Sequence, residues 1–125
     1  MLKCGTARAV ITPASPVRMA GYADRTGPYE GKYEDIWLRA LHLSDTESGR
    51  RAVIVSADLI WFNPEMMGLL EERLATIGYS RDEVVFTATH NHSGPGNGNA
   101  FIPPLENGER AYMERLAGIA AETAE

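Results

Sequence analysis

Short apolar stretches, separated by polar segments rich in glycine and proline, set the pattern of this 125-residue chain. Four of these stretches favour β-strands, because they are rich in β-branched residues or alternate apolar with polar positions. They are LKCGTARAVITP at 2–13, IWLRALHLSD at 36–45, AVIVSADLI at 52–60 and EVVFTAT at 83–89. The last two are almost continuously apolar, which predicts strands buried on both faces, as in a parallel sheet. Residues 13–35 contain several prolines and glycines and predict a long irregular loop.

A helix is predicted between the third and fourth strands. Asn63 is a suitable N-cap, Pro64 suits the first helical position, and Gly78 is placed to end the helix. Apolar residues recur between them at helical spacing, namely Met66, Leu69, Leu70, Leu74 and Ile77. This connection is long enough to make the two flanking strands parallel. Residues 52–88 therefore predict a parallel strand–helix–strand unit.

A second helix is predicted in the tail NGERAYMERLAGIAAETAE, with Tyr112, Leu116 and Ile119 on one stripe. It reaches Glu125 without a stop signal, so we expect the chain to be one part of a longer domain. The fold class predicted is α/β, with a mixed sheet that contains the parallel strand–helix–strand unit. Residues 1–125 form a single domain segment in this interpretation, without repeats or an internal linker.

Charge and composition narrow the range of functions. Lys and Arg number 12 against 17 Asp and Glu, and the resulting net charge of −5 argues against a nucleic-acid partner. Cys4 is the only cysteine, which excludes an intrachain disulfide and a zinc cluster of thiolates. No stretch approaches the roughly 20 apolar residues of a membrane span. The N-terminus does not read as a secretion signal, so we expect a cytoplasmic protein, or a secreted one if a leader has been removed.

Two of the three histidines, His90 and His92, directly follow the fourth predicted strand. Residues two apart on a strand share a face, so both imidazoles can converge on one ion about 2 Å from each ring nitrogen. Zinc is the first candidate, and iron or manganese would also suit these ligands. The glycine-rich SGPGNGN that follows is either a plain turn or a loop whose backbone N–H groups approach a substrate oxygen.

Asp58 ends the third predicted strand as the histidines end the fourth. Since the carboxyl ends of parallel strands lie at one edge of a sheet, we expect Asp58 to face the same crevice. There it could orient an imidazole, ligate directly, or simply cap its own turn. His42 reads as an ordinary strand residue, and Trp37 and Trp61 as core residues rather than substrate platforms.

These motifs resemble the N-terminal part of the neutral/alkaline, non-lysosomal ceramidases. The matching stretches are GTARAVITP, MAGYA, IWLRAL, VIVSADL and TATHNHSGPG, in that order, over roughly residues 5–98. The family string Thr-His-X-His-Ser-Gly-Pro-Gly is present from Thr89 to Gly96. The resemblance implies a zinc-dependent amidase that splits ceramide into sphingosine and a fatty acid. It assigns His90 as a zinc ligand and places His92 in the active site, in contact with the substrate or the reacting water. From the spacing of the pair, we keep His92 as a second metal ligand or a proton-transfer partner.

On these grounds we assign substrate contacts to Ser93, Gly94 and Gly96, and a catalytic role to His92 and Asp58.

The chain also departs from the family pattern. Relatives often carry Gly-X-His ahead of IWLRAL, where this chain has Tyr33, and the family's remaining zinc ligands lie far downstream. The rest of such an enzyme is therefore an expected partner, together with a lipid or small-molecule amide substrate.

Three alternatives stand beside a ceramidase-like enzyme. A metallo-β-lactamase-like hydrolase needs Asp and His directly after the histidine pair, where this chain has Gly94 and Pro95. A related hydrolase acting on another amide or ester, and a non-catalytic metal-binding fragment, both stay open.

Overall fold

The computed structural model describes all residues 1–125. A four-stranded sheet has the order β1-β2-β3-β4 and is formed by β1 (Leu2–Val10), β2 (Trp37–Asp45), β3 (Arg51–Ala57) and β4 (Val84–Ala88). The first three strands are antiparallel neighbours, and β4 is parallel to β3. The helices are α1 (Pro64–Thr76), the 3-10 turn η1 (Arg81–Glu83), the short α2 (Pro103–Glu106) and α3 (Arg110–Ala124). The predicted mixed α/β sheet with its parallel strand–helix–strand unit is confirmed.

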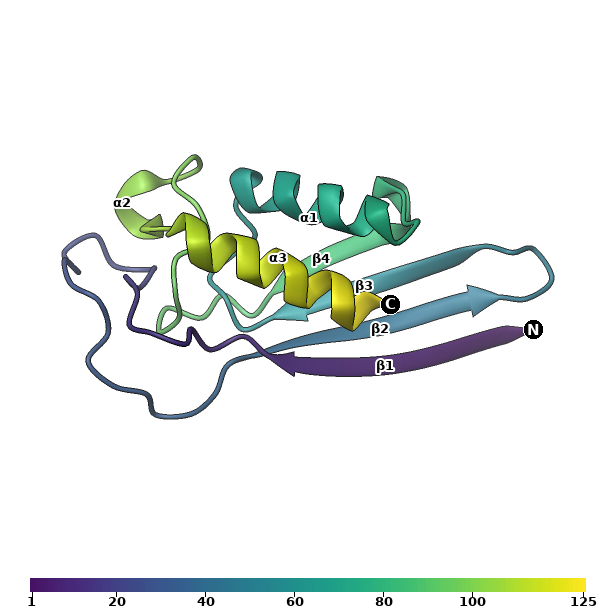
Figure 1. The fold of residues 1–125 in the computed structure, drawn as a ribbon, viewed down its shortest axis with the longest axis horizontal. Helices are drawn as coiled ribbons and strands as arrows, with labels where there is room; N and C mark the ends of the chain where they lie inside the picture. The colour runs from purple at the N-terminus through teal and green to yellow at the C-terminus, as the bar shows by residue number, and fades with distance from the viewer.

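The core lies between the sheet and the two long helices. Figure 1 shows α1 and α3 side by side on the same face of the sheet, with the N-terminus at one end of the molecule. Leu70 of α1, Leu116 of α3 and Val55 of β3 are completely buried there. Each such side chain stabilises the fold by about 1.5–3 kcal/mol relative to its exposed state. The predicted apolar stripes of both helices are therefore the faces that they bury.

The boundaries of α1 follow from local chemistry. Asn63 has an extended backbone and accepts the Glu65 N–H at 2.9 Å, so it is the predicted N-cap. The helix ends where Gly78 adopts a left-handed conformation at φ 83°, and its N–H donates to Ala75 O at 3.0 Å. The short helix α2 was not predicted, since its PPLE sequence is only four residues long.

One prediction about the sheet is wrong. The third and fourth strands were expected to be buried on both faces, yet Ile54 is only half buried and Val85 is 55% exposed. Both α1 and α3 cover the same face, so the other face carries no second layer in this structure (Figure 1). Apolar content alone therefore overstated the burial of β3 and β4.

The sheet positions the candidate site at one end. The carboxyl ends of β3 and β4 lie together on the side of the molecule opposite the N-terminus, where the loop before β2 and the loop after β4 also gather (Figure 1). None of the helices in the structure is long and apolar enough to cross a membrane.

At the opposite end, Arg51 of β3 is joined to Glu83 of η1. Their Nε–Oε1 distance is 3.0 Å, and this hydrogen bond, with the Ser80 N–H, lowers the pKa of Glu83 from its ordinary 4.5 to about 2. A carboxylate whose pKa falls on folding stabilises the protein fully above its unfolded pKa. That stabilisation is lost as the pH falls from about 4.5 towards 2.

We therefore expect Glu83→Gln to lower the urea midpoint at pH 7 and to flatten the pH dependence of stability between pH 4.5 and 2. Urea unfolding followed by circular dichroism at several pH values measures both effects. Glu30→Gln is the matched control, because Glu30 is exposed and forms no ion pair. Equal behaviour of the two variants would contradict the assignment.

Candidate metal centre

His90 and His92 lie where the chain leaves β4. The strand ends at Ala88, but Thr89 N–H and Asn91 N–H still donate to Ala57 O and Leu59 O, each at 3.0 Å. His90 itself has φ 62°, a left-handed conformation that is strained for a non-glycine residue. The imidazoles therefore converge through a turn rather than through the strand geometry that was predicted.

Backbone carbonyls fix both imidazole rings. His90 Nδ1 lies 2.9 Å from Ile60 O, and His92 Nδ1 lies 3.0 Å from Gly21 O. A carbonyl oxygen only accepts hydrogen bonds, so each Nδ1 carries the proton. In the neutral rings, each Nε2 then presents its lone pair, and the two Nε2 atoms face each other at 3.2 Å.

This arrangement fits two corners of a metal site. Two nitrogens about 2.0–2.1 Å from a zinc ion at the tetrahedral angle lie roughly 3.3 Å apart. A structural or catalytic zinc uses three or four protein ligands. No group of three or more His, Cys, Asp or Glu side chains in this chain could hold a metal ion. Two imidazoles alone are therefore too few ligands for such a site.

The Asp58 carboxylate has partners other than the imidazoles. Its carboxylate accepts the Trp37 N–H at 2.9 Å and pairs with the Arg39 guanidinium at 3.2 Å. It is hydrogen-bonded to neither imidazole, and both Nδ1 atoms have backbone carbonyls as partners. The orienting contact predicted for Asp58 is thus absent from this structure, and its catalytic role stays a prediction.

The segment 20–25 clamps His92. Besides the Gly21 carbonyl contact, Arg25 Nη1 donates to His92 O at 3.0 Å and to Ala20 O at 3.1 Å. The Arg25 guanidinium also lies over the Tyr22 ring, whose centroid is 5.4 Å from that of His92. Sequence reasoning missed Arg25, since nothing local to it signals a contact with a residue so distant in the chain.

Aromatic rings surround His90. Trp61 lies beside the imidazole with the ring centroids 6.0 Å apart, and Phe101 packs edge-on against Trp61. Trp61 is half buried, so its predicted place in the core is wrong. Its indole N–H donates to Glu106, a 1% exposed carboxylate that also accepts from Asn63 and from the Phe101 N–H. Glu106 therefore holds the loop after β4 against Trp61.

The glycines after the histidine pair serve close backbone packing. A Cβ atom at Gly96 would overlap the Glu106 carbonyl, and the Gly96 N–H donates to Arg18 O at 3.2 Å. Gly94 O accepts the Ala20 N–H at 3.0 Å. The Ser93 N–H donates to the Asn91 side chain at 2.7 Å. Substrate contacts by Ser93, Gly94 and Gly96 stay predictions, although the Gly96 and Ser93 N–H groups already have partners within the chain.

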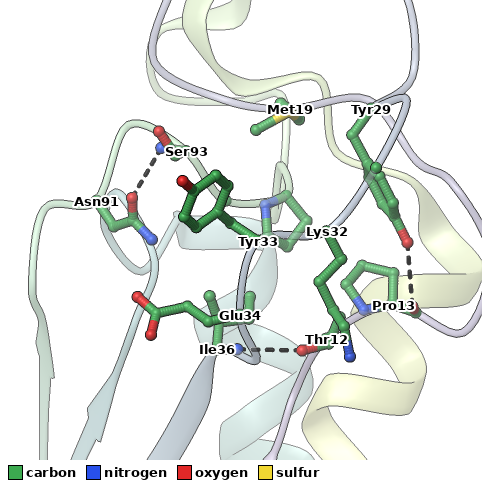
Figure 2. A pocket seen from close by; sticks show the side chains of 13 residues that line it. Thr12, Pro13, Met19, Tyr29, Lys32, Tyr33, Glu34, Ile36, Asn91 and Ser93 are labelled. Atoms are coloured by element: carbon green, nitrogen blue, oxygen red, sulfur yellow. Dashed lines mark hydrogen bonds between the residues drawn. The ribbon is translucent and has the colours of Figure 1, made fainter.

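A cavity of about 200 Å³ lies beside this segment. Figure 2 shows that side chains from the loop before β2, such as Tyr29 and Tyr33, line it together with Asn91 and Ser93. Tyr33 is fully exposed, and its hydroxyl forms no hydrogen bond within the chain. Neither imidazole lines this cavity.

Comparison with known proteins shows which family this chain belongs to. Residues 2–104 match the family model described as neutral/alkaline non-lysosomal ceramidase, N-terminal. The chain belongs to this family. It is 35% identical over 96 residues to the neutral ceramidase of Pseudomonas aeruginosa, which covers 74% of this chain. The resemblance drawn from the sequence motifs is confirmed.

Solved structures of the family have the same fold. The crystal structure of the neutral ceramidase from Pseudomonas aeruginosa matches 98% of this chain with a TM-score of 0.84 and 26% identity. A ceramidase complexed with C2 matches the same share with a TM-score of 0.83 and 25% identity. The chain spans only 14% of the curated relative and 20% of each solved chain. It therefore corresponds to a small part of these family members.

Gly21→Ala tests how the second histidine is held. A Cβ at Gly21, where φ is 105°, would lie 2.7 Å from His92 Nδ1. We expect a loss of about 1–3 kcal/mol in unfolding free energy. We also expect the Nδ1–H signal of His92 to shift or disappear in long-range ¹H–¹⁵N spectra of the imidazoles.

Gly31→Ala is the control for this variant. No atom lies within 4 Å of a Cβ at Gly31, and the position is exposed. Its stability should stay within about 0.5 kcal/mol of the parent. An unchanged His92 signal in Gly21→Ala would show that the clamp does not set the ring orientation.

Proposed function

We propose that this chain supplies the first part of the active site of a ceramidase-like hydrolase that cleaves an N-acyl amide bond with the help of zinc. The observation that carries the proposal is the pair of Nε2 atoms facing each other at 3.2 Å, with both tautomers set by carbonyls. Membership of the ceramidase family supports the choice of substrate class, ceramide or a similar lipid amide.

His90 and His92 are the residues of this chain that would hold the metal. A bound zinc ion lowers the pKa of its water to about 7 and polarises a carbonyl group. The chain's own contribution is orientation, since Ile60 O and Gly21 O hold both protons at Nδ1 and leave both Nε2 atoms free. The Trp61 and Phe101 rings make the His90 side apolar, which suits a lipid chain.

The remaining ligands would come from outside these residues. Two imidazoles fall short of a zinc site, and the chain spans 20% of the solved family members. The activity proposed here therefore belongs to a longer polypeptide that contains this segment.

A different acyl substrate is the second candidate. Tyr33 stands where relatives often carry a histidine, and it is a fully exposed ring on the wall of the 200 Å³ cavity. This difference from the relatives is the reason to keep a related amide or ester as the second candidate substrate.

We expect His90→Ala in the full-length polypeptide to remove bound zinc and to lower amide hydrolysis by more than the roughly 10- to 100-fold that loss of an outer-sphere partner costs. Metal analysis by mass spectrometry and turnover of a fluorescent ceramide measure the two effects. His42→Ala is the control, since His42 bonds to the Tyr79 hydroxyl at 2.7 Å, away from the pair. Normal zinc content in His90→Ala would overturn the proposal.

A further inference from the structure

The outer edge of β4 has no partner strand. β4 is the last strand in the sheet order, and β3 pairs with it on one side only. The Thr89 N–H donates to Ala57 O of β3. Because backbone N–H and C=O groups alternate in direction along a strand, those of Val85 and Thr87 also point towards β3. The backbone N–H and C=O groups of Phe86 and Ala88 therefore point outwards, away from the sheet.

An apolar groove follows this edge. Its volume is about 670 Å³, and it runs from Arg81 at one end to His90 at the other. Trp61, Phe62 and Met67 line it opposite β4, and most of the lining side chains are hydrophobic. The groove therefore ends at one ligand of the candidate metal centre.

Arg81 closes the far end of the edge. Its Nη1 donates to Val84 O at 3.0 Å, and its Nε pairs with Glu71 at 2.8 Å. Val84 O is an outward-facing carbonyl by the same alternation, so this end of the strand is already capped by a charged side chain. The free part of the edge is the stretch from Phe86 to His90, next to the metal centre.

The geometry points to a further strand of the same enzyme as the occupant of this edge. This inference rests on the proposed function, in which the segment is part of a longer polypeptide. Outward N–H and C=O groups need hydrogen-bond partners when they are covered, and a strand supplies them whereas a lipid tail does not. The apolar wall formed by Trp61, Phe62 and Met67 suits the alternating side chains of an added strand.

The position of this strand bears on the missing ligands. Paired strands lie about 4.7–4.9 Å apart, so a His, Asp or Glu on the added strand beside Ala88 would be close to His90. The β4 edge would then be both a structural seam and the place where the metal centre is completed.

Residue-resolved hydrogen exchange on the natural full-length polypeptide tests the inference. We expect the Phe86 and Ala88 amides to be protected at least 100-fold over the rate of an unstructured peptide. The Val85 and Thr87 amides, which face β3, serve as the protected reference. Gly27 and Gly31, exposed in the loop before β2, serve as the unprotected reference.

The outcomes separate this inference from the proposed function. Zinc binding and amide hydrolysis, with Phe86 and Ala88 exchanging as fast as Gly27, would overturn the inference and leave the function standing. Protected Phe86 and Ala88 in a polypeptide without hydrolysis would support the added strand and refute the function. A native polypeptide of 13.7 kDa would overturn the inference, and protection that then grows with concentration would assign the edge to a second copy.

Discussion

The candidate site depends on two hydrogen bonds from imidazole Nδ1 atoms to backbone carbonyls. His90 is held by Ile60 O and His92 by Gly21 O, and with these contacts the two Nε2 atoms face each other. The four residues come from three separate segments of the chain. The fold therefore has to bring the loop before β2, the exit of β3 and the exit of β4 to a single point.

The parallel pairing of β3 with β4 does most of this. It places residues 58–60 and 89–92 side by side at one end of the sheet, and α1 provides the connection that makes the pairing parallel. Close packing then locks the loop after β4, since Gly96 leaves no room for a side chain beside the Glu106 carbonyl. Glu106 in turn holds Trp61 against His90. The glycines that follow the histidines thus serve to let backbone segments pack closely.

Sequence patterns within short windows predicted those features that depend on neighbouring residues. The four strands, the Asn63 cap and the parallel unit follow from periodicity and end signals within short windows, and the histidine pair follows from its motif. Arg25 and Glu106 could not be found in that way, because their partners lie tens of residues away. The open face of the sheet was missed for a related reason. An apolar strand sequence indicates that burying its side chains is favourable, but it does not indicate which part of the protein covers each face.

The charges around the histidine pair bear on what the complete centre needs. Both imidazoles are neutral ligands, and both of their outer partners are neutral carbonyls rather than carboxylates. The nearest predicted carboxylate, Asp58, is already paired with Arg39. A divalent cation at the two Nε2 atoms would thus keep nearly its full charge. In a partly apolar surrounding such a charge is unfavourable unless anionic ligands offset it. If the pair holds a divalent cation, as proposed, the residues that complete its site therefore have to contribute negative charge as well as further ligands.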